Sequence, residues 1–173
     1  MRRGLWYNTW SMDDFRTGFG YDSHRFDAGR RLVLGGVEFT EGPGLAGHSD
    51  ADAVIHAVID ALLGAAALGD IGSHFPDSDE KWRGADSSRL LAMVVDEIFA
   101  AGWRVGNVDV TVICERPKIS ARADAMRERL AGLLRVPVAC VSVKGKTNEK
   151  MDDVGAGAGV EVHAACLLKG TEK

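Results

Sequence analysis

The sequence predicts a single α+β domain in which helices pack on one face of a mixed β-sheet. The first observation is composition: 173 residues, 46% of them hydrophobic and 27% charged, supply enough apolar material for one buried core. The second is that segments with helical spacing of apolar residues are interspersed with segments of strand spacing. The third is that no internal repeat or linker divides the chain, so we expect one domain over residues 15–170.

The N-terminal half predicts two strands, a helix and a long loop. Thr17–Tyr21 and Arg31–Phe39 have strand character, and we expect them to pair as a hairpin, with Gly35-Gly36 interrupting the second strand. The next helix has apolar residues at helical spacing, which are Val54, Ile55, Val58, Ile59, Leu62 and Leu63. Ser49 or Asp50 can cap its start, and Gly69 can end it. The segment 70–84 is rich in Gly, Pro, Ser and Asp and is predicted to be a functional loop.

The C-terminal half predicts two further helices and three strands. Asp86, Ser87 or Ser88 caps a helix that Gly102 ends, and its buried stripe comprises Leu90, Leu91, Val94, Val95 and Ile98. Valines alternate with polar residues from Asn107 to Cys114, which predicts a strand that Pro117 terminates. A third helix is capped near Ser120, and the strands 140–144 and 159–168 flank a loop over 145–158. The last strand is apolar enough to indicate that other subunits cover the second sheet face.

Charge and cysteine content exclude several classes of protein. The net charge is −4, which gives no general attraction to nucleic acid or to an anionic membrane. The longest apolar stretch, around Val54 to Leu68, is interrupted by His56 and Asp60 and falls short of the ~20 residues of a membrane span. Cys114, Cys140 and Cys166 are far apart and odd in number, which indicates buried thiols in a reducing cytoplasm.

Residues 1–14 have no continuous apolar stretch of the signal-peptide type and are expected to form a disordered extension. Met12 is an alternative start of the chain.

A set of metal-binding residues can be assembled from spacing. Asp22 and His24 are two apart in or just after a strand, so their side chains project to one side. Together with His56 on the following helix they predict a zinc triad with an open fourth position, as in catalytic sites. The alternative is that the two histidines are unrelated, one solvated and the other hydrogen-bonded in the core.

Several ordered segments resemble the 2-C-methyl-D-erythritol 2,4-cyclodiphosphate synthase family. They are D-S-H at 22–24, H-S-D-A-D-A-V-I-H at 48–56, A-L-L-G-A-A-A-L-G-D-I-G at 61–72, H-F-P-D-S-D at 74–79, G-A-D-S at 84–87 and N-V-D-V-T-V-I at 107–113. The likeness covers the chain from about Thr17 to Leu168. Because the segments share the family's order and spacing, together they are far more specific than any one motif.

The resemblance implies an enzyme of the non-mevalonate isoprenoid pathway. Its substrate would be 4-diphosphocytidyl-2-C-methyl-D-erythritol 2-phosphate, whose 2-phosphate attacks the β-phosphate and expels CMP, a phosphorus–oxygen lyase reaction. It also implies a ferredoxin-like or chorismate-mutase-like sandwich that assembles into a homotrimer with interfacial active sites. Zinc and a second divalent ion, magnesium or manganese, are the implied cofactors.

The resemblance also assigns roles to residues of this chain. His48 and Thr147 match catalytic positions, Asp22, His24 and His56 match the zinc ligands, and Glu149 matches the position that reaches the second divalent ion. The matched substrate-binding positions are Ser49, Asp60, Asp70, Ile71, Gly72, Phe75, Pro76, Asp77, Ser78, Asp79, Cys114, Glu115, Arg116, Pro117, Lys118, Ile119, Ser120, Lys146 and Asn148. On the residues alone, His48 is equally a helix-cap residue, the 70–79 positions equally loop turns, and Glu149 part of a charged surface turn.

The chain departs from the family pattern between the last two strands. Asp153 stands where an aromatic residue is common, and Ala156 and Ala158 replace an arginine and a glutamate that line the central cavity of the family trimer. An isoprenoid diphosphate proposed to bind there would lose a bidentate phosphate partner. Lys146 stands where small or hydroxylated residues are usual and adds a cation.

Two other functions share the open zinc site. A zinc-dependent phosphohydrolase would use it to deliver hydroxide to a phosphate ester and release inorganic phosphate. A non-catalytic trimeric scaffold would use zinc as a staple, and it predicts a fourth protein ligand closing the metal.

Overall fold

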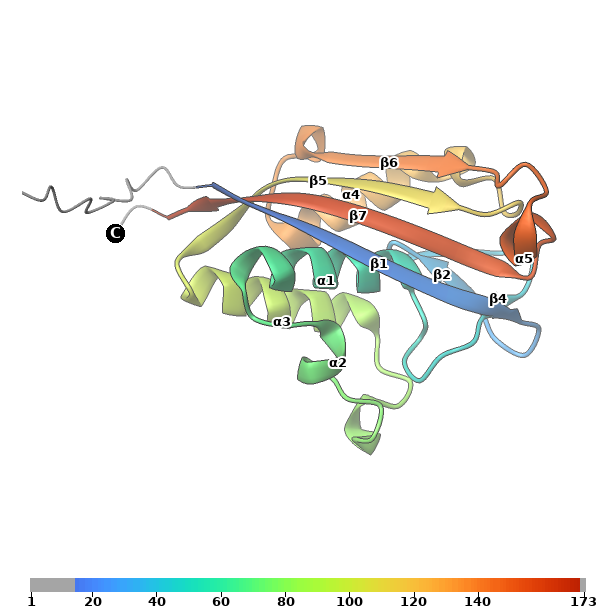
Figure 1. Ribbon diagram of the computed structural model, residues 1–173, viewed down its shortest axis with the longest axis horizontal. Coiled ribbons are helices and arrows are strands. Elements are labelled where there is room, and N and C mark those ends of the chain that lie inside the picture. Colours follow the sequence, from blue (N-terminus) through green and yellow to red (C-terminus); the bar gives the residue numbers. More distant parts are fainter. Residues whose placement is uncertain (1–14, 172–173) are drawn as a thin grey trace, which may run out of the picture.

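The computed structural model describes residues 15–171, as a single α+β body (Figure 1). The extension expected at residues 1–14 lies outside the described residues. Within the described part, no helix is long and apolar enough to cross a membrane.

A five-stranded mixed sheet forms one layer of the molecule. Its strand order is β4-β1-β7-β5-β6, and every neighbouring pair is antiparallel except β5 and β6. The strands are β1 (Phe15–Asp27), β4 (Gly44–Leu45), β5 (Trp103–Ile113), β6 (Val141–Lys146) and β7 (Gly159–Gly170). The predicted mixed sheet is therefore confirmed.

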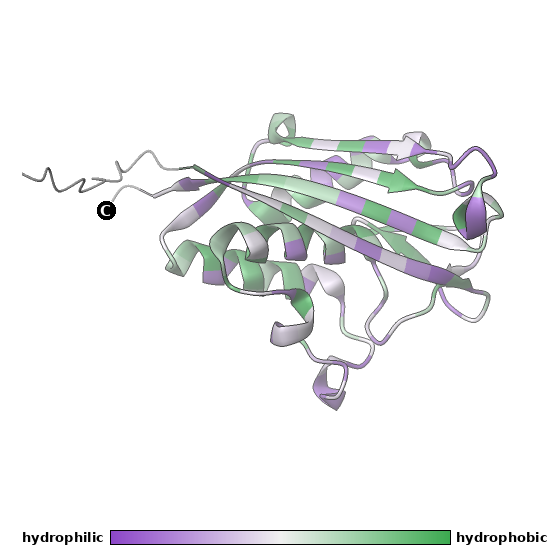
Figure 2. Cartoon of the chain, in the orientation of Figure 1, coloured by the Kyte–Doolittle hydropathy of each residue, from purple (hydrophilic) through white to green (hydrophobic). Residues whose placement is uncertain are grey.

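Three helices form the second layer, on one face of the sheet, as predicted (Figure 1). They are α1 (Ala53–Ala66), α3 (Ser87–Ala100) and α4 (Ala123–Leu134). Figure 2 shows α1 and α3 as mostly hydrophobic, while the strands alternate in hydropathy along their length. The core lies between the layers, because the helices bury their apolar residues against the inward side chains of the strands.

Short elements complete the chain. The described residues include the strands β2 (Leu32–Leu34) and β3 (Val37–Phe39), the helices α2 (Ile71–His74) and α5 (Asp152–Gly155), and 3₁₀ turns at Glu80–Trp82, Ile119–Ala121 and Val138–Cys140. The segments 70–84 and 145–158, predicted as loops, thus contain single helical turns.

The predicted hairpin between Thr17–Tyr21 and Arg31–Phe39 is wrong. β1 pairs with β7 and β4, while β2 and β3 pair with each other in a separate two-stranded sheet. Gly35 and Gly36 form the turn between β2 and β3, with φ of 61° and 71°. Two consecutive positive φ angles are what a tight two-residue hairpin needs, so the glycine pair makes a turn where a single interrupted strand was expected.

The capping residue of α1 also differs from the prediction. Asp52, not Ser49 or Asp50, caps the helix by accepting hydrogen bonds from the backbone N–H groups of Val54 and Ile55, both at 3.1 Å. The same buried carboxylate accepts from Gly35 and Gly36, and so fixes the β2–β3 turn to the helix. Burial raises the pKa of Asp52 to about 6, although these hydrogen bonds oppose the shift.

The other helix ends follow the expected logic with local changes. Ala67 in the left-handed region ends α1 before Gly69 is reached, whereas Asp86 caps α3 as predicted. The segment at Ser120 forms a 3₁₀ turn, and α4 begins at Ala123 with no side-chain cap.

Two glycines let β1 lie directly on α1. A Cβ atom at Gly18 would lie 1.9 Å from the carbonyl oxygen of Ala61, and one at Gly20 would lie 2.0 Å from that of Ala57. Only residues without a side chain can approach a helix backbone this closely. The contact sets the height of β1 over α1 and thereby the distance between Asp22 and His56.

The outward face of the sheet and the helix face differ in character. Phe19 and Tyr21, which point away from the helices, are 65% and 45% exposed.

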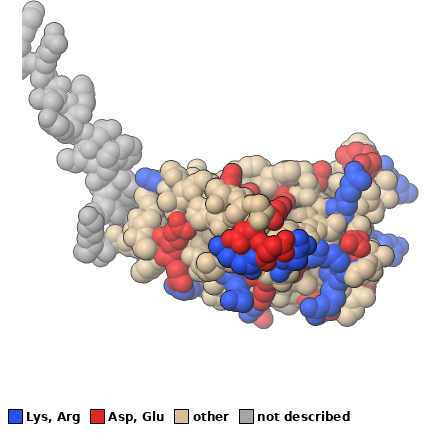
Figure 3. All heavy atoms as spheres, turned by 90° about the horizontal axis from the view of Figure 1, so that it is seen from below, with Lys and Arg blue, Asp and Glu red and all other residues tan. Residues whose placement is uncertain are grey.

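Figure 3, which views the molecule from below, shows acidic and basic side chains intermingled. Exposed ion pairs of the described residues include Arg83–Glu80 and Arg135–Asp96.

Of the three cysteines, Cys114 and Cys166 are buried thiols as predicted, whereas Cys140 is partly exposed. All three are free.

Candidate active site

The three side chains predicted to hold zinc meet at one point. Asp22 and His24 project from β1 toward α1, because residues two apart on a strand share a side. Asp22 Oδ2 lies 2.9 Å from His24 Nε2 and 2.9 Å from His56 Nδ1. The two histidine nitrogens are 3.3 Å apart. The alternative of two unrelated histidines is therefore excluded.

These separations suit a metal ion. Ligand atoms bound tetrahedrally to zinc at about 2.0–2.1 Å lie about 3.3 Å from one another. The three atoms of the triad are already near that spacing, and no fourth His, Cys, Asp or Glu of the described residues joins them. Two imidazoles, one carboxylate and an open position fit a catalytic or ligand-binding zinc better than a closed structural one.

The electrostatics of the triad keep its carboxylate ionised. Burial by itself would raise the pKa of Asp22, but hydrogen bonds with His24 and His56 outweigh it and hold the pKa well below the usual range. Burial would likewise lower the pKa of His24, but the contact with Asp22 outweighs it and the pKa is raised. Because metal ligands must be deprotonated, metal binding would compete with the proton that this contact favours on His24.

The far side of each imidazole is also hydrogen-bonded. His24 Nδ1 lies 2.6 Å from the carbonyl oxygen of Ala46, to which it can donate its proton. His56 Nε2 lies 3.1 Å from Ser49 Oγ and 3.0 Å from Ser87 Oγ. A histidine held in this way at one ring nitrogen presents the other to a metal in a fixed orientation.

His48 lies next to the triad, in a segment that is held by hydrogen bonds to its backbone. The guanidinium of Arg30 donates to the carbonyl oxygens of Gly47 and Ser49, which flank His48. His48 Nδ1 lies 3.9 Å from Asp77 Oδ1, while its Nε2 is buried with no hydrogen-bond partner among the described residues. A buried ring nitrogen without a partner is costly unless a ligand supplies one.

The predicted hydroxyl-binding carboxylates cap the loop that carries them. Asp60 Oδ1 accepts from the N–H of Ile71 at 2.7 Å, and burial raises the pKa of Asp60. Asp70 caps α2 in a capping box with Ser73, and Asp79 caps the following 3₁₀ turn. Phe75 is buried and packs edge-on against Trp82. Gly72, Asp77 and Ser78 are exposed, and Pro76 is partly exposed.

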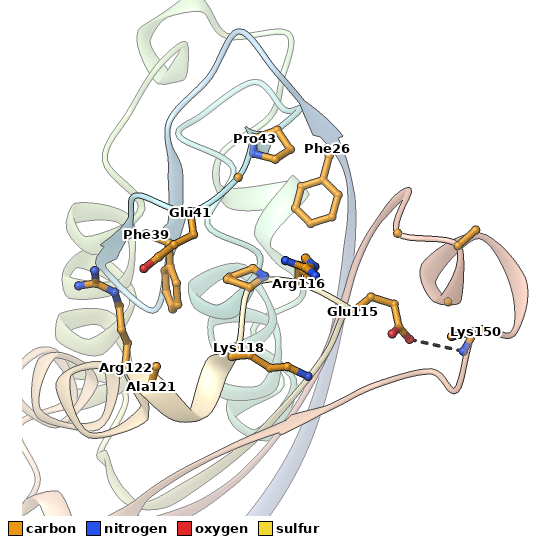
Figure 4. Close-up of a pocket in the computed structure, with 15 residues that line it drawn as sticks. Phe26, Phe39, Glu41, Pro43, Glu115, Arg116, Lys118, Ala121, Arg122 and Lys150 are labelled. Carbon is orange, nitrogen blue, oxygen red and sulfur yellow. Dashed lines mark hydrogen bonds between the residues drawn. The ribbon is translucent and has the colours of Figure 1, made fainter.

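A second group of predicted residues lines a cavity of about 1080 Å³ (Figure 4). From the predicted nucleotide loop it includes Glu115, Arg116, Pro117 and Lys118. Its other walls are Phe26, Phe39, Glu41, Gly42, Pro43, Ala121, Arg122, Lys150, Gly155, Ala156 and Gly157. Cys114 and Ile119 face the core, so their side chains do not line this cavity.

Glu115 joins the two loops at this end of the sheet. Its carboxylate accepts from the backbone N–H of Asn148 at 3.0 Å and from that of Lys150 at 3.5 Å, the second bond being drawn in Figure 4. Thr147 donates its hydroxyl to Glu149 at 2.6 Å in the same loop. The loops meet because β5 and β6 are parallel neighbours whose carboxyl ends lie at one edge. Lys146 and Ser120 are exposed nearby.

Apart from Asp60 and the 70–79 loop, the predicted residues of one chain form two groups. Asp22, His24, His56, His48 and Ser49 surround the triad, and the residues around Glu115 and Lys118 surround the cavity. Among the hydrogen bonds of residues 15–171, none joins a member of the first group to a member of the second.

Sequence reasoning missed the residues that support the triad from behind. Ala46 acts through its backbone carbonyl, which no sequence pattern reveals. Ser87 was expected only as a possible helix cap, and Asp50 only as a cap of α1. The only sequence signal for Ser87 was the G-A-D-S segment at 84–87. That segment resembles the family, but no role was assigned to it.

Comparison with known proteins agrees with this geometry. The model of the YgbB family matches residues 15–169. A 2-C-methyl-D-erythritol 2,4-cyclodiphosphate synthase of Brachyspira hyodysenteriae is 52% identical over 157 residues, which cover 91% of this chain and 99% of that protein. A bifunctional enzyme IspD/IspF of Anaeromyxobacter dehalogenans is 58% identical over 152 residues, and this chain spans only 39% of its length.

Solved structures give the same result. The bifunctional IspDF of Campylobacter jejuni superposes with a TM-score of 0.89 at 36% identity, covering 92% of this chain and 43% of that one. IspF of Plasmodium falciparum, solved as a CDP complex, superposes with a TM-score of 0.81 at 33% identity, covering 94% of this chain and 100% of that one.

The family match extends over residues 15–169, and the relatives share half or more of their aligned residues with this chain. The chain therefore belongs to the YgbB family, the family of the 2-C-methyl-D-erythritol 2,4-cyclodiphosphate synthases.

Proposed function

We propose that this chain converts 4-diphosphocytidyl-2-C-methyl-D-erythritol 2-phosphate into 2-C-methyl-D-erythritol 2,4-cyclodiphosphate and CMP. The observation that carries the proposal is the open triad of Asp22, His24 and His56 beside His48, whose Nε2 lacks a partner. Such a site is suited to hold an anionic phosphate oxygen at the open position. Family membership supplies the substrate class.

The reaction depends more on how the protein positions the two phosphates than on acid–base catalysis. An oxygen of the 2-phosphate forms a bond to the β-phosphorus, the bond to the α-phosphate oxygen breaks, and CMP leaves with that oxygen. Because the attacking phosphate is already anionic, no strong base is needed. A bound zinc ion would supply a Lewis acid that orients and partly neutralises a phosphate. His48 and Ser49 would hold phosphate oxygens through the His48 ring and the Ser49 hydroxyl.

The nucleotide would bind in the cavity beyond the carboxyl end of β5, which Phe26 of β1 also lines. Lys118 would supply a compact cation for a phosphate, and the segment 115–118 would form one wall for the cytosine. Thr147 would contact the transferring group. Glu149 would reach a second divalent ion, magnesium or manganese, since carboxylate oxygens suit such hard ions.

The complete site would form between neighbouring copies in a homotrimer. Two features of the chain support this arrangement. No hydrogen bond of the described residues joins the triad to the Lys118 loop, and the outward sheet face exposes Phe19 and Tyr21. An antiparallel-rich sheet with large apolar side chains on its uncovered face is suited to subunit contact. Residues 15–170 would be the domain that assembles.

Phosphorus NMR of the purified protein with the diphosphocytidyl substrate and magnesium tests the reaction. We expect CMP and a cyclic diphosphate, with both signals lost after zinc chelation and restored by added zinc. Release of inorganic phosphate without a cyclic product would instead indicate a phosphohydrolase. Unchanged substrate in the presence of bound zinc would indicate a scaffold.

A further inference from the structure

A strained turn lies between β6 and α5. The backbone N–H of Met151 donates to the carbonyl oxygen of Asn148 at 2.8 Å, which closes the turn. Its two central residues, Glu149 and Lys150, have φ of 49° and 62°. Two successive positive φ angles are the pattern of a type I′ turn, which is normally built from Gly, Asn or Asp. Longer side chains strain the backbone in this conformation, and such strain persists only where the surroundings hold it.

The side chain of Glu115, just beyond the end of β5, holds this turn (Figure 4). Its Oε1 accepts hydrogen bonds from the backbone N–H of Asn148 at 3.0 Å and from that of Lys150 at 3.5 Å. Other contacts of the turn come from residues nearby in the chain. The amide of Asn148 donates to Asp152 Oδ2 at 2.8 Å, and the backbone of Lys150 packs on Gly155. Glu115 is the contact that ties the turn to the sheet.

The turn carries the side chains that the proposed function assigns to the transferring group and to the second divalent ion. Glu149 is its first central residue, and Thr147 directly precedes the turn. Thr147 donates its hydroxyl to Glu149 Oε1 at 2.6 Å, so the positions of the two side chains are coupled. If the turn relaxed to the negative φ that such residues favour, the Glu149 side chain would change direction and Thr147 would lose this partner.

We propose that Glu115 is a positioning residue that holds the 148–151 turn in its left-handed conformation and thereby directs Thr147 and Glu149 toward the nucleotide phosphates and their divalent ion. This role needs an acceptor oxygen at the correct distance and not a negative charge, because both partners are backbone N–H groups. The inference rests on the roles proposed for Thr147 and Glu149. Partners that orient a metal ligand typically change metal affinity or activity by about 10–100-fold when they are removed.

Two substitutions of Glu115 separate the reach of the side chain from its charge. Glu115→Gln keeps the length and an oxygen that can accept from both N–H groups, but it removes the charge. Glu115→Asp keeps the charge but shortens the side chain by one methylene, which withdraws the carboxylate from the turn. We therefore expect Glu115→Gln to preserve the geometry of the turn and Glu115→Asp to lose it.

Manganese binding provides the first readout. Zinc-loaded protein is titrated with Mn²⁺ in the presence of CDP, and the free Mn²⁺ is followed by electron paramagnetic resonance. Glu115→Asp should bind Mn²⁺ about 10–100-fold more weakly than the unaltered chain, whereas Glu115→Gln should bind it about as tightly. Equal affinity in all three proteins, loss of affinity in Glu115→Gln, or no CDP-dependent Mn²⁺ binding by the unaltered chain would overturn the proposal.

Hydrogen exchange reads the turn directly in the ligand-free protein. NMR should show the backbone amides of Asn148 and Lys150 exchanging faster in Glu115→Asp than in the unaltered chain, with no such change in Glu115→Gln. Circular dichroism establishes that both variants are folded. Unchanged exchange in Glu115→Asp would show that other contacts hold the turn, and it would contradict the proposal.

The rate of CMP release separates this inference from the proposed function. Glu115→Asp should lower kcat about 10–100-fold while its zinc content stays unchanged. A chain that makes no cyclic product, but loses CDP-dependent Mn²⁺ affinity in Glu115→Asp, would retain the inference and lose the proposed reaction. Cyclic product formed at equal rates by the unaltered chain and both variants would retain the reaction and overturn the inference.

Discussion

Asp22, His24 and His56 depend on one another more than on any other residues of the site. Asp22 Oδ2 is shared between the two imidazoles, and each imidazole is held from behind by a separate partner. Removing one histidine leaves a carboxylate and a single imidazole, which is too few ligands for tight zinc binding. Loss of any one of the three ligands should therefore abolish tight zinc binding.

Replacing His56 by alanine should abolish stoichiometric zinc while the chain remains folded. The change removes one of three ligands at a site where side chains are partly exposed, so the core is left intact. Zinc content by elemental analysis after dialysis gives the result, with circular dichroism to establish the fold. His74→Ala is the matched control, because His74 pairs with Glu97 and is not part of the triad. This variant should keep its bound zinc. Stoichiometric zinc in His56→Ala would show that the ligands are assigned wrongly.

The triad was predictable from the sequence because its members follow simple spacing rules. Two residues two apart on a strand and one residue on the next helix can be placed on facing surfaces without coordinates. Asp52 was not predictable in this way. Its carboxylate caps α1 and also holds the Gly35-Gly36 turn, and that second contact arises from the tertiary fold.

At the scale of elements, the contact between β1 and α1 sets the geometry of the triad. Gly18 and Gly20 allow the strand to rest on the backbone of the helix, which brings Asp22 within 2.9 Å of His56. The strand and the helix were both predicted, but the strand was expected to pair in a hairpin with Arg31–Phe39. The error arose because pairing with β7, which begins more than a hundred residues later, leaves no local signal.

Gly20→Ala should destabilise the protein and weaken zinc binding together. The new Cβ would lie 2.0 Å from the carbonyl oxygen of Ala57, a backbone atom that cannot move away alone. Overpacking of this kind costs about 1–3 kcal/mol in the free energy of unfolding, which urea denaturation measures. Displacing β1 should also separate Asp22 and His24 from His56.

Gly64→Ala provides the control for this prediction. Gly64 lies in the same helix, is exposed, and has no atom within 4 Å of an added Cβ. Alanine there should raise the free energy of unfolding by about 0.5–1 kcal/mol, because glycine is a poor helix former. Equal stability of Gly20→Ala and the unaltered protein would mean that β1 does not need its close approach to α1.

At the scale of the whole molecule, the triad and the cavity around Lys118 share no hydrogen bond within residues 15–171 of one chain. The sequence placed both groups correctly within their loops and helices, but it could not place them relative to each other. The register that sets Ser23 and Ile113 opposite the same residue of β7, Glu161, is a tertiary feature that leaves no local signal in the sequence. The exposed Phe19 and Tyr21 on the outward sheet face are consistent with neighbouring copies that complete each site.

We propose that each active site joins the triad of one copy to the Lys118 loop of the next, an arrangement that involves residues, elements and the whole assembly. Co-refolding equal amounts of His56→Ala and Lys118→Ala, each inactive or nearly so alone, tests it by phosphorus NMR of the cyclic product. A site between a Lys118→Ala copy and a His56→Ala copy can be intact in both parts, so random mixing should restore about a quarter of the activity. Native mass spectrometry would establish that mixed trimers formed. Activity no greater than the sum of the separate variants, in samples that contain mixed trimers, would contradict a shared site.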